Sequence, residues 1–159
     1  MLVIRKARPG DVPVMLQFIR ELAEYEKEPQ AVVATEADLL RDGFGDSPRY
    51  FCLVAEWEGA PAAFAFYFHT YSTWLGRWGM YLEDLFVRPA FRGRGIGKAL
   101  LAELARIAVR EECGRVNWQV LDWNTPAIGF YERLGAKMLT EWETFRLTGD
   151  ALERLARDG

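Results

Sequence analysis

A glycine-rich segment near the middle of the chain, RGRGIGK at residues 92–98, constrains the fold more than any other feature of the sequence. It follows a run of strand-forming residues ending at Val87, and it precedes a helical pattern in which Leu100, Leu104 and Ile107 share one side. Alternate glycines let backbone N–H groups approach a ligand closely, and the start of a helix adds a partial positive charge. With three cationic side chains beside it, the segment predicts a strand-to-helix turn that binds an anion such as a diphosphate.

Two common phosphate-binding loops do not fit this segment. A Walker A loop ending at Gly97-Lys98 requires glycine at position 92 and a hydroxyl residue at position 99, where the chain has Arg92 and Ala99. A Rossmann fingerprint starting at Gly93 requires glycine at position 98, where the chain has lysine, and it belongs after the first strand of a parallel sheet. The sequence therefore disfavours ATP or GTP hydrolysis and NAD binding.

Strand and helix patterns surround this segment, and we expect a single domain over residues 1–159. Their order is β-α-α-β-β-β-α-β-α-β-β, which predicts an α/β (α+β) fold with a mixed central β-sheet flanked by helices. The predicted strands are Leu2–Ala7, Tyr50–Trp57, Ala62–Tyr71, Gly79–Val87, Arg115–Leu121, Ala136–Leu139 and Thr144–Leu147, with a Glu58-Gly59 turn between the second and the third. The predicted helices are Asp11–Tyr25, Glu36–Arg41 ended by Gly43, a long helix from the glycine segment to a C′ glycine at Gly114, Thr125–Leu134, and a C-terminal helix from Asp150.

The composition fits a globular protein and narrows its partners. The chain has 159 residues, of which 50% are hydrophobic and 27% charged, and its formal net charge is −3. This acidic balance disfavours sequence-independent nucleic-acid binding, and no apolar stretch is long enough to span a membrane. We therefore expect a cytoplasmic protein with no nucleic-acid or membrane partner, to which small cationic molecules can bind.

The thiols and the one imidazole predict no metal site. Cys52 and Cys113 lie far apart in the sequence, and His69 is the only histidine. This spacing matches neither a disulfide framework nor a thiolate metal knuckle, and one histidine cannot complete a zinc site by itself. We expect both cysteines to be core thiols and His69 to be structural.

Several segments carry a resemblance to a known family. The pattern Arg-x-x-Gly-x-Gly after YLEDLFV (residues 81–87) resembles the GCN5-related N-acetyltransferases (GNAT), which hold the pyrophosphate of acetyl-CoA with it. The stretches ELAEYE (21–26), DLLRDGFG (38–45), FCLVAE (51–56) and WNTPAIGFYERLGA (123–136) look like the spermidine/spermine N1-acetyltransferase and thialysine acetyltransferase branch of that family. The resemblance covers most of the chain in order. It implies the GNAT fold, acetyl-CoA as cosubstrate and a homodimer.

The resemblance also implies roles for individual residues. Glu83, the first carboxylate of the LED motif, is expected to contact the acceptor amine and to act as a base, directly or through water, and Tyr131 to protonate the leaving CoA thiolate. The implied cofactor-binding residues are Leu85, Phe86, Val87, Arg92, Gly93, Arg94, Gly95, Ile96, Gly97, Lys98, Asn124, Pro126 and Ala127. The implied substrate-binding residues are Tyr25, Glu26, Glu83, Asp84, Asn117, Trp118 and Gln119.

Strand geometry adds an expectation of its own for the two adjacent carboxylates. Side chains alternate along a strand, so Glu83 and Asp84 should face opposite sides of the sheet unless a bulge intervenes. We therefore expect only one of them to face the substrate directly.

The expected acceptor is a primary amine of a small cation. Four glutamates surround Tyr25 between residues 21 and 28, and such an anionic cluster can attract a diamine or polyamine. Animal polyamine acetyltransferases of the resembled branch carry an aspartate where this chain has Ser72, which cannot pair with an ammonium, so thialysine-like amines and diamines stay open beside polyamines. Direct acetyl transfer in a ternary complex competes with two other hypotheses: acetylation of a protein or peptide, and a non-catalytic CoA-binding module.

Overall fold

The computed structural model describes residues 1–159, which form two compact units, Met1–Gln119 and Val120–Gly159. The first unit contains β1 (Leu2–Lys6), η1 (Pro9–Asp11), α1 (Val12–Tyr25), η2 (Pro29–Ala31), α2 (Glu36–Phe44), β2 (Phe51–Trp57), β3 (Ala60–Ser72), β4 (Arg77–Val87), η3 (Pro89–Phe91), α3 (Ile96–Arg110) and β5 (Val116–Trp118). The second contains α4 (Thr125–Arg133) and α5 (Gly149–Asp158). None of these helices combines the length and the apolar character needed to cross a membrane.

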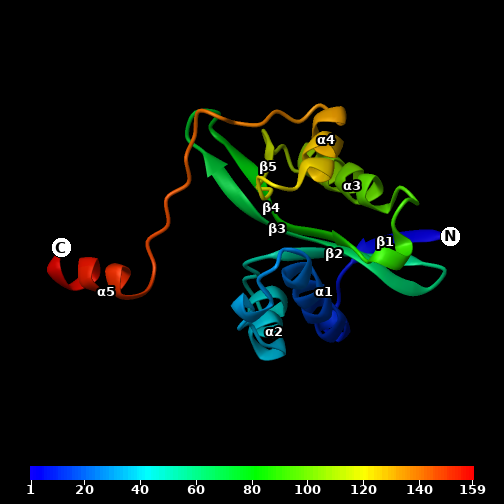
Figure 1. Cartoon of the computed structure of the whole chain (residues 1–159), viewed down its shortest axis with the longest axis horizontal. Coiled ribbons are helices and arrows are strands. Elements are labelled where there is room, and N and C mark those ends of the chain that lie inside the picture. Colours follow the sequence, from blue (N-terminus) through cyan, green and yellow to red (C-terminus); the bar gives the residue numbers. More distant parts are fainter. The chain divides into compact units, whose positions relative to one another are not determined.

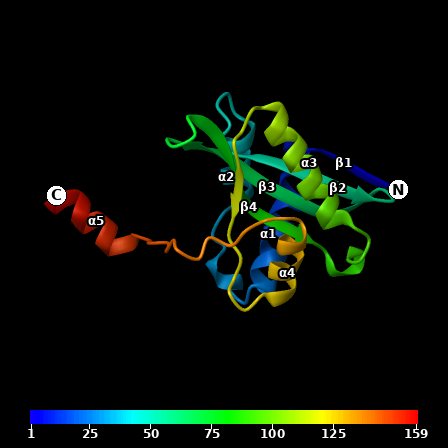
Figure 2. The same ribbon diagram turned by 90° about the horizontal axis from the view of Figure 1, so that it is seen from above.

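The first unit is built on a five-stranded sheet in the order β1-β2-β3-β4-β5. Strands β1 to β4 are antiparallel neighbours, whereas β5 follows α3 and pairs with β4 in parallel. Helices α1 and α2 cover one face of the sheet and α3 covers the other (Figures 1 and 2). The predicted mixed sheet flanked by helices is therefore confirmed.

A separate apolar cluster lies on each face of this sheet. On the face covered by α1 and α2, Phe18 stacks on Phe64 of β3 with ring centroids 5.1 Å apart, and both side chains are fully buried. On the face covered by α3, Leu100 and Leu104 pack with Met80 of β4. Because helices cover both faces of the sheet, β2 to β4 contain long runs of apolar residues instead of alternating apolar and polar residues.

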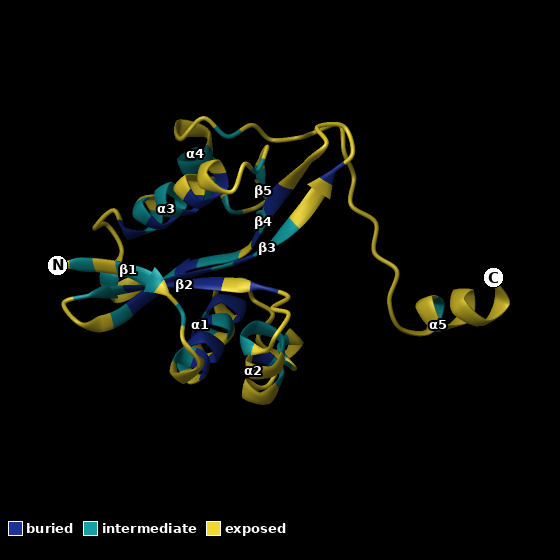
Figure 3. Cartoon of the chain, turned by 180° about the vertical axis from the view of Figure 1, so that it is seen from behind, coloured by how far each residue is buried: buried dark blue, intermediate teal, exposed yellow.

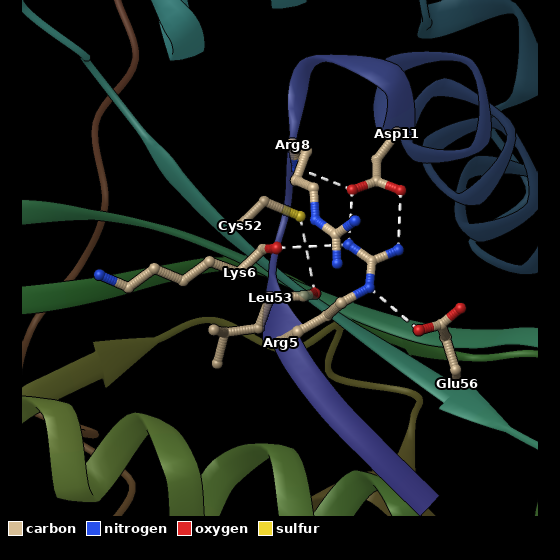
Figure 4. A network of polar contacts seen from close by, with 7 residues as sticks. All are labelled: Arg5, Lys6, Arg8, Asp11, Cys52, Leu53 and Glu56. Carbon is tan, nitrogen blue, oxygen red and sulfur yellow. Dashed lines mark hydrogen bonds and ion pairs between the residues drawn. The ribbon is translucent and has the colours of Figure 1, made fainter. Parts of the chain in front are cut away.

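A charged network fixes β1 to the start of α1 and to β2 (Figure 4). The guanidinium of Arg5 donates two hydrogen bonds to the Asp11 carboxylate, at 2.7 and 2.9 Å, and its Nε donates a third to Glu56 at 3.0 Å. Asp11 also accepts a bond of 2.7 Å from the backbone N–H of Arg8. These bonds hold the pKa of the Asp11 carboxyl below its usual value, chiefly through Arg5.

The hairpin between β2 and β3 follows the prediction, but two predicted helix ends are wrong. Glu58 and Gly59 both have positive φ, as a tight two-residue turn requires. Helix α2 continues through Gly43 to Phe44, and an added Cβ at Gly43 would overlap the Tyr50 ring. At the end of α3 the left-handed residue is Glu112, with φ 59°, and Gly114 has no such conformation. Gly43 therefore makes room for the Tyr50 ring instead of ending α2. At the end of α3, Glu112 takes the left-handed position that was expected for Gly114.

Two predicted strands near the C-terminus are also wrong. Residues 136–139 and 144–147 form no strand, and β5 ends at Trp118 instead of continuing to Leu121. The second unit contains no strand with which those segments could pair, and alternating apolar residues alone do not make a strand. Its helices α4 and α5 have no buried residue, and α5 is exposed along nearly its whole length (Figure 3).

Candidate active site

A β-bulge in β4 determines where the two carboxylates of the LED motif lie. Leu82 pairs with Tyr67 of β3, and Asp84 pairs with Phe66, so Glu83 is an extra residue without a partner on β3. Tyr67 belongs to the apolar cluster on the α3 face, whereas Phe66 packs with the cluster on the α1 face. The regular alternation of β4 side chains between the two faces of the sheet is therefore interrupted at Glu83.

This change brings Glu83 and Asp84 to the same face of the sheet. Tyr81 packs against Phe68 on the α1 face, and the side chain of Glu83, two residues later, points to that same face. Asp84 shares the face because it lies opposite Phe66. The alternation that would place the two carboxylates on opposite faces is therefore interrupted, and the stated exception, an intervening bulge, is what the structure contains.

Helix α1 adds a third carboxylate beside these two. Glu26 is the C-cap residue of α1, and it is partly buried. Burial raises the pKa of the Glu26 carboxyl, and the charge of Glu83 raises it further. The carboxylates of α1 and β4 thus lie close enough to repel each other when all of them are ionised.

Asp84 is the most perturbed member of this carboxyl cluster, which we define as Glu26, Glu83 and Asp84. Burial raises the pKa of Asp84 to about 7, with further contributions from the charges of Glu83 and Glu26. The neighbouring Tyr81 hydroxyl has its pKa raised by burial and by the same two strand carboxylates. An arriving cation would relieve this repulsion, so the cluster is suited to binding a positively charged group.

Sequence reasoning did not identify Tyr81 as part of the site. Its spacing of two residues before Glu83 was the available signal, because side chains two apart on a strand share a face. Tyr81 also packs on Phe68, with ring centroids 5.2 Å apart. It therefore lies between the apolar cluster and the carboxyl cluster.

The glycine segment forms the predicted strand-to-helix turn. Gly93 and Gly95 have φ of 79° and 77°, which favour glycine, and Gly95 is the N-cap of α3. Gly97 lies inside the helix, where an added Cβ would only touch Val87 at 3.7 Å. The segment therefore requires glycine at two of its three positions.

The start of α3 contains backbone donors that no intrahelical bond uses. The N–H of Ala99 donates to the carbonyl of Gly95 at 3.0 Å, so the N–H groups of Ile96, Gly97 and Lys98 precede the first intrahelical bond. The side chains of residues 92, 94 and 98 add exposed positive charge around this helix end. Such a turn can hold a diphosphate.

Arg92 links this turn to the end of α1. Its guanidinium lies over the rings of Tyr25 and Phe86, with centroids at 5.3 and 5.7 Å, and its Nε donates to the carbonyl of Val87 at 3.0 Å. Arg94 turns instead toward β2, where its guanidinium lies 5.0 Å from the Trp57 ring centroid. The glycine turn at the start of α3 and the carboxyl cluster are thus neighbours within one unit.

The end of the pairing between β4 and β5 leaves an open sheet edge. Only Met80, Tyr81 and Leu82 pair with β5, at residues 116–118, so residues 83–87 have no strand on that side. Leu85 and Val87 direct their side chains to the α3 face, and Phe86 is buried on the α1 face. Of these three, Leu85 and Val87 direct their backbone groups to the open edge, since Phe86 pairs with Phe64 of β3 and Arg92 already donates to the carbonyl of Val87. The N–H groups of Leu85 and Val87 can pair with an extended ligand.

The predicted substrate residues on β5 separate onto two faces. Asn117 is exposed and pairs with Tyr81, so it shares the face of the carboxyl cluster. Trp118 pairs with Leu82 and packs with the cluster under α3, and Gln119 follows the end of the strand. Asn117 is therefore the member of this group that the sheet brings to the carboxylates.

The remaining predicted site residues belong to the second unit. Asn124 is the N-cap of α4 and accepts a hydrogen bond of 3.4 Å from the N–H of Ala127, with Pro126 in the first turn. Tyr131 lies on α4, partly exposed, with its ring centroid 5.5 Å from that of Phe130. Asn124 therefore caps α4.

Comparison with known proteins assigns a family to this arrangement. The model of the acetyltransferase (GNAT) family matches residues 15–136. Thialysine N-epsilon-acetyltransferase of Bos taurus is 44% identical over 97% of this chain and 96% of its own length. Spermidine/spermine N(1)-acetyltransferase-like protein 1 of Homo sapiens is 39% identical over 96% of this chain, which corresponds to 23% of that protein.

A solved structure supports the same assignment. The integron cassette protein VCH_CASS6 from the mobile metagenome of V. cholerae superposes with a TM-score of 0.82, is 29% identical, and covers 98% of both chains. The resemblance seen in the sequence motifs is thereby confirmed. The chain belongs to the acetyltransferase (GNAT) family and is an N-acetyltransferase.

Proposed function

We propose that this enzyme transfers the acetyl group of acetyl-CoA to a primary amine of a small cation, a diamine, a polyamine or a thialysine-like amino acid, by direct transfer in a ternary complex. The observation that carries the proposal is the arrangement of the first unit, in which three carboxyl groups share a face next to an anion-binding turn. The relatives named for thialysine and spermidine/spermine acetylation support an acceptor of this class.

The cosubstrate fits the turn at the start of α3 and the open edge of β4. The family uses acetyl-CoA, which supplies the acetyl group as a thioester. Free N–H groups at the helix start, together with Arg92, Arg94 and Lys98, suit its diphosphate. The N–H groups of Leu85 and Val87 at the open edge of β4 suit the amides of its pantetheine arm. Asn124, Pro126 and Ala127 of the second unit complete the proposed cofactor set by resemblance.

The carboxyl cluster would hold and deprotonate the acceptor. An alkylammonium with a pKa near 10.4 loses its proton at pH 7 at a cost of about 4 to 5 kcal/mol, so a nearby base is required. Glu83 would accept that proton, directly or through water, because the bulge makes it exposed on the substrate face. Glu26 and Asp84 would balance the charge of the cation, with Tyr25 and Asn117 beside them. Trp118 and Gln119 remain weaker members of the proposed substrate set.

Tyr131 would supply the final proton. Transfer of the acetyl group releases a thiolate, and a tyrosine hydroxyl has a suitable pKa to protonate it in a dry site. This role rests on the match of Tyr131 to the family motif. In this proposal the base, Glu83, lies on β4, and the acid, Tyr131, lies on α4.

Ser72 has a structural task that bears on the acceptor. It is 4% exposed, and its hydroxyl accepts a hydrogen bond of 3.1 Å from the N–H of Leu75, which closes the turn between β3 and β4. A buried hydroxyl of this kind offers nothing to a second ammonium of a long polyamine. Short amines are therefore the better candidates among the three classes.

The test is acetyl-CoA consumption with a panel of thialysine, lysine, ornithine, short diamines, spermidine and lysine peptides. We expect turnover with at least one free amine and a large loss of kcat in Glu83→Gln. Glu26→Gln should raise the KM of the amine, whereas Glu24→Gln, an exposed glutamate on the same helix, should leave it unchanged. Turnover with peptides alone would favour protein acetylation, and cofactor binding without any turnover would favour a binding module.

We also propose a cytoplasmic homodimer. The free thiols of Cys52 and Cys113 suit a reducing compartment. The second unit exposes apolar side chains, with Phe145 95% and Leu155 60% accessible, and a partner subunit could cover them. Light scattering of the full chain and of Phe145→Ser tests the dimer, which should weaken in the variant.

A further inference from the structure

Three side chains with metal-binding atoms meet near the end of α3, on the face of the sheet opposite the carboxyl cluster. His69 lies on β3, and Glu111 and Cys113 follow the last turn of α3. One atom of each, an imidazole nitrogen, a carboxylate oxygen and a thiol sulfur, lies within 4.8 Å of the other two. The Nε2 of His69 and the Oε2 of Glu111 are 2.8 Å apart.

The backbone at the end of α3 directs two of these donors to the same place. The N–H of Cys113 donates to the carbonyl of Ala108 at 2.8 Å, and that of Glu112 donates to Val109 at 3.1 Å, which is the bonding of a Schellman motif. Glu112 takes the left-handed position of this motif, with φ 59°. The chain therefore reverses between Glu111 and Cys113, so that both lie next to β3.

Aromatic rings hold the imidazole in place. The His69 ring is nearly perpendicular to the rings of Phe51 and Trp78, with centroids at 5.3 and 6.1 Å. Its side chain is 25% exposed. The ring therefore keeps little rotational freedom, and its Nε2 already points toward Glu111.

All three donors open into one cavity. Its volume is about 510 Å³, and it is also lined by Pro48, Arg49, Phe51 and Trp78. Arg49 is the one cation in this lining, and it is exposed, so its guanidinium can stay in water. The cavity has room for a metal ion with a bound water.

We propose that His69, Glu111 and Cys113 form a Zn²⁺ site with three protein ligands and one position open to the cavity. One nitrogen, one sulfur and one oxygen suit a borderline metal better than Mg²⁺ or Ca²⁺, which prefer oxygen ligands alone. Binding replaces the thiol proton of Cys113, which passes to the solvent. The ion would tie β3 to the end of α3.

The required adjustment of the ligands is small. Tetrahedral Zn²⁺ with bonds of about 2.0 to 2.3 Å places its ligand atoms roughly 3.3 to 3.7 Å apart. Glu111 must withdraw slightly from His69, and Cys113 must approach. The Glu111 side chain is 43% exposed, so it can rotate without disturbing the core.

The experiment is titration of the untagged full chain with Zn²⁺ by calorimetry and with Co²⁺ by absorption. We expect one equivalent to bind, with a thiolate-to-cobalt charge-transfer band, and a rise in melting temperature with Zn²⁺. Cys113→Ser and Glu111→Gln should each lower the affinity for Zn²⁺ by about 10-fold or more, because loss of a residue that only hydrogen-bonds a metal ligand already costs about that much. Cys52→Ala and Glu112→Gln are the matched controls and should keep both the affinity and the band.

Two results would overturn the proposal. One is the absence of saturable binding, and the other is binding that survives unchanged in Cys113→Ser. The melting temperatures of the metal-free variants show whether each is folded. Acetyl transfer by the metal-free protein should be the same in Cys113→Ser as in the unchanged chain, which separates this site from the proposed acetyl-transfer site.

Discussion

The substitution Asp84→Asn tests the physical state of the carboxyl cluster. In the folded protein, burial and two neighbouring charges raise the pKa of Asp84 from 3.8 to about 7. The unfolded chain therefore releases this proton near pH 4, while the folded chain keeps it up to about pH 7. The folded state binds more protons over that interval, so its free energy of unfolding falls as the pH rises through it.

The magnitude follows from the two pKa values. A tenfold change in proton affinity corresponds to about 1.4 kcal/mol, so the full effect of Asp84 approaches about 4 kcal/mol above pH 7. Asparagine has nearly the same shape as aspartate and cannot ionise, so the free energy of unfolding of Asp84→Asn does not fall in this way. Between pH 5 and pH 8, the stability of Asp84→Asn relative to the unchanged chain should increase by about 2 to 3 kcal/mol.

The assay is urea denaturation of both proteins at several values of pH from 5 to 8. Asp46→Asn, at an exposed position, is the control and should show no such trend. Equal stability differences at pH 5 and pH 8 would refute the reasoning, because Asp84 would then be ionised in the folded protein throughout. The gain in stability should come with weaker binding of the amine, because a carboxylate that destabilises the fold is kept for its interaction with the substrate.

Three further predictions concern the turn, the acid and the charged network. Gly95→Ala should lower the stability in thermal unfolding by about 1 to 2 kcal/mol, because the backbone φ of Gly95 is 77°, and it should weaken acetyl-CoA binding in calorimetry. The control Gly97→Ala should leave both unchanged, because a Cβ at that position meets only Val87 at 3.7 Å. Tyr131→Phe should lower kcat about 100-fold with nearly unchanged cofactor affinity, and an unchanged rate would remove it from the proposed role. Asp11→Asn should cost about 1 to 3 kcal/mol at pH 7 in urea denaturation, and the cost should shrink in acid, because the lowered pKa of Asp11 gives stability that is lost as that carboxylate is protonated.

The sequence was most informative where a local pattern has one physical solution. Glu58-Gly59 between two strand-forming runs predicted the hairpin, and the alternate glycines before a helical stripe predicted the turn at the start of α3. Both follow from short-range sterics, and the structure confirms them. The motifs that carried the family resemblance are equally local.

The sequence was less informative where the outcome depends on contacts across the fold. Alternation placed Glu83 and Asp84 on opposite faces, but the register between β3 and β4 changes at that point, and no local signal fixes such a change. The apolar alternation at residues 136–147 predicted strands, yet strands require partners, and the second unit has none. The cluster of His69, Glu111 and Cys113 joins residues more than 40 positions apart, which the spacing of single residues could not reveal.

The early end of β5 has a consequence for the self-association of the protein. Beyond Leu82, the N–H groups of Leu85 and Val87 face an edge of β4 that no other strand covers, next to a well-packed core. A peptide strand can add to such an edge as readily as a pantetheine arm, so the same edge can also start self-association. A cosubstrate bound along that edge would block such self-association, and slower amide exchange at Leu85 and Val87 in its presence would report its binding there.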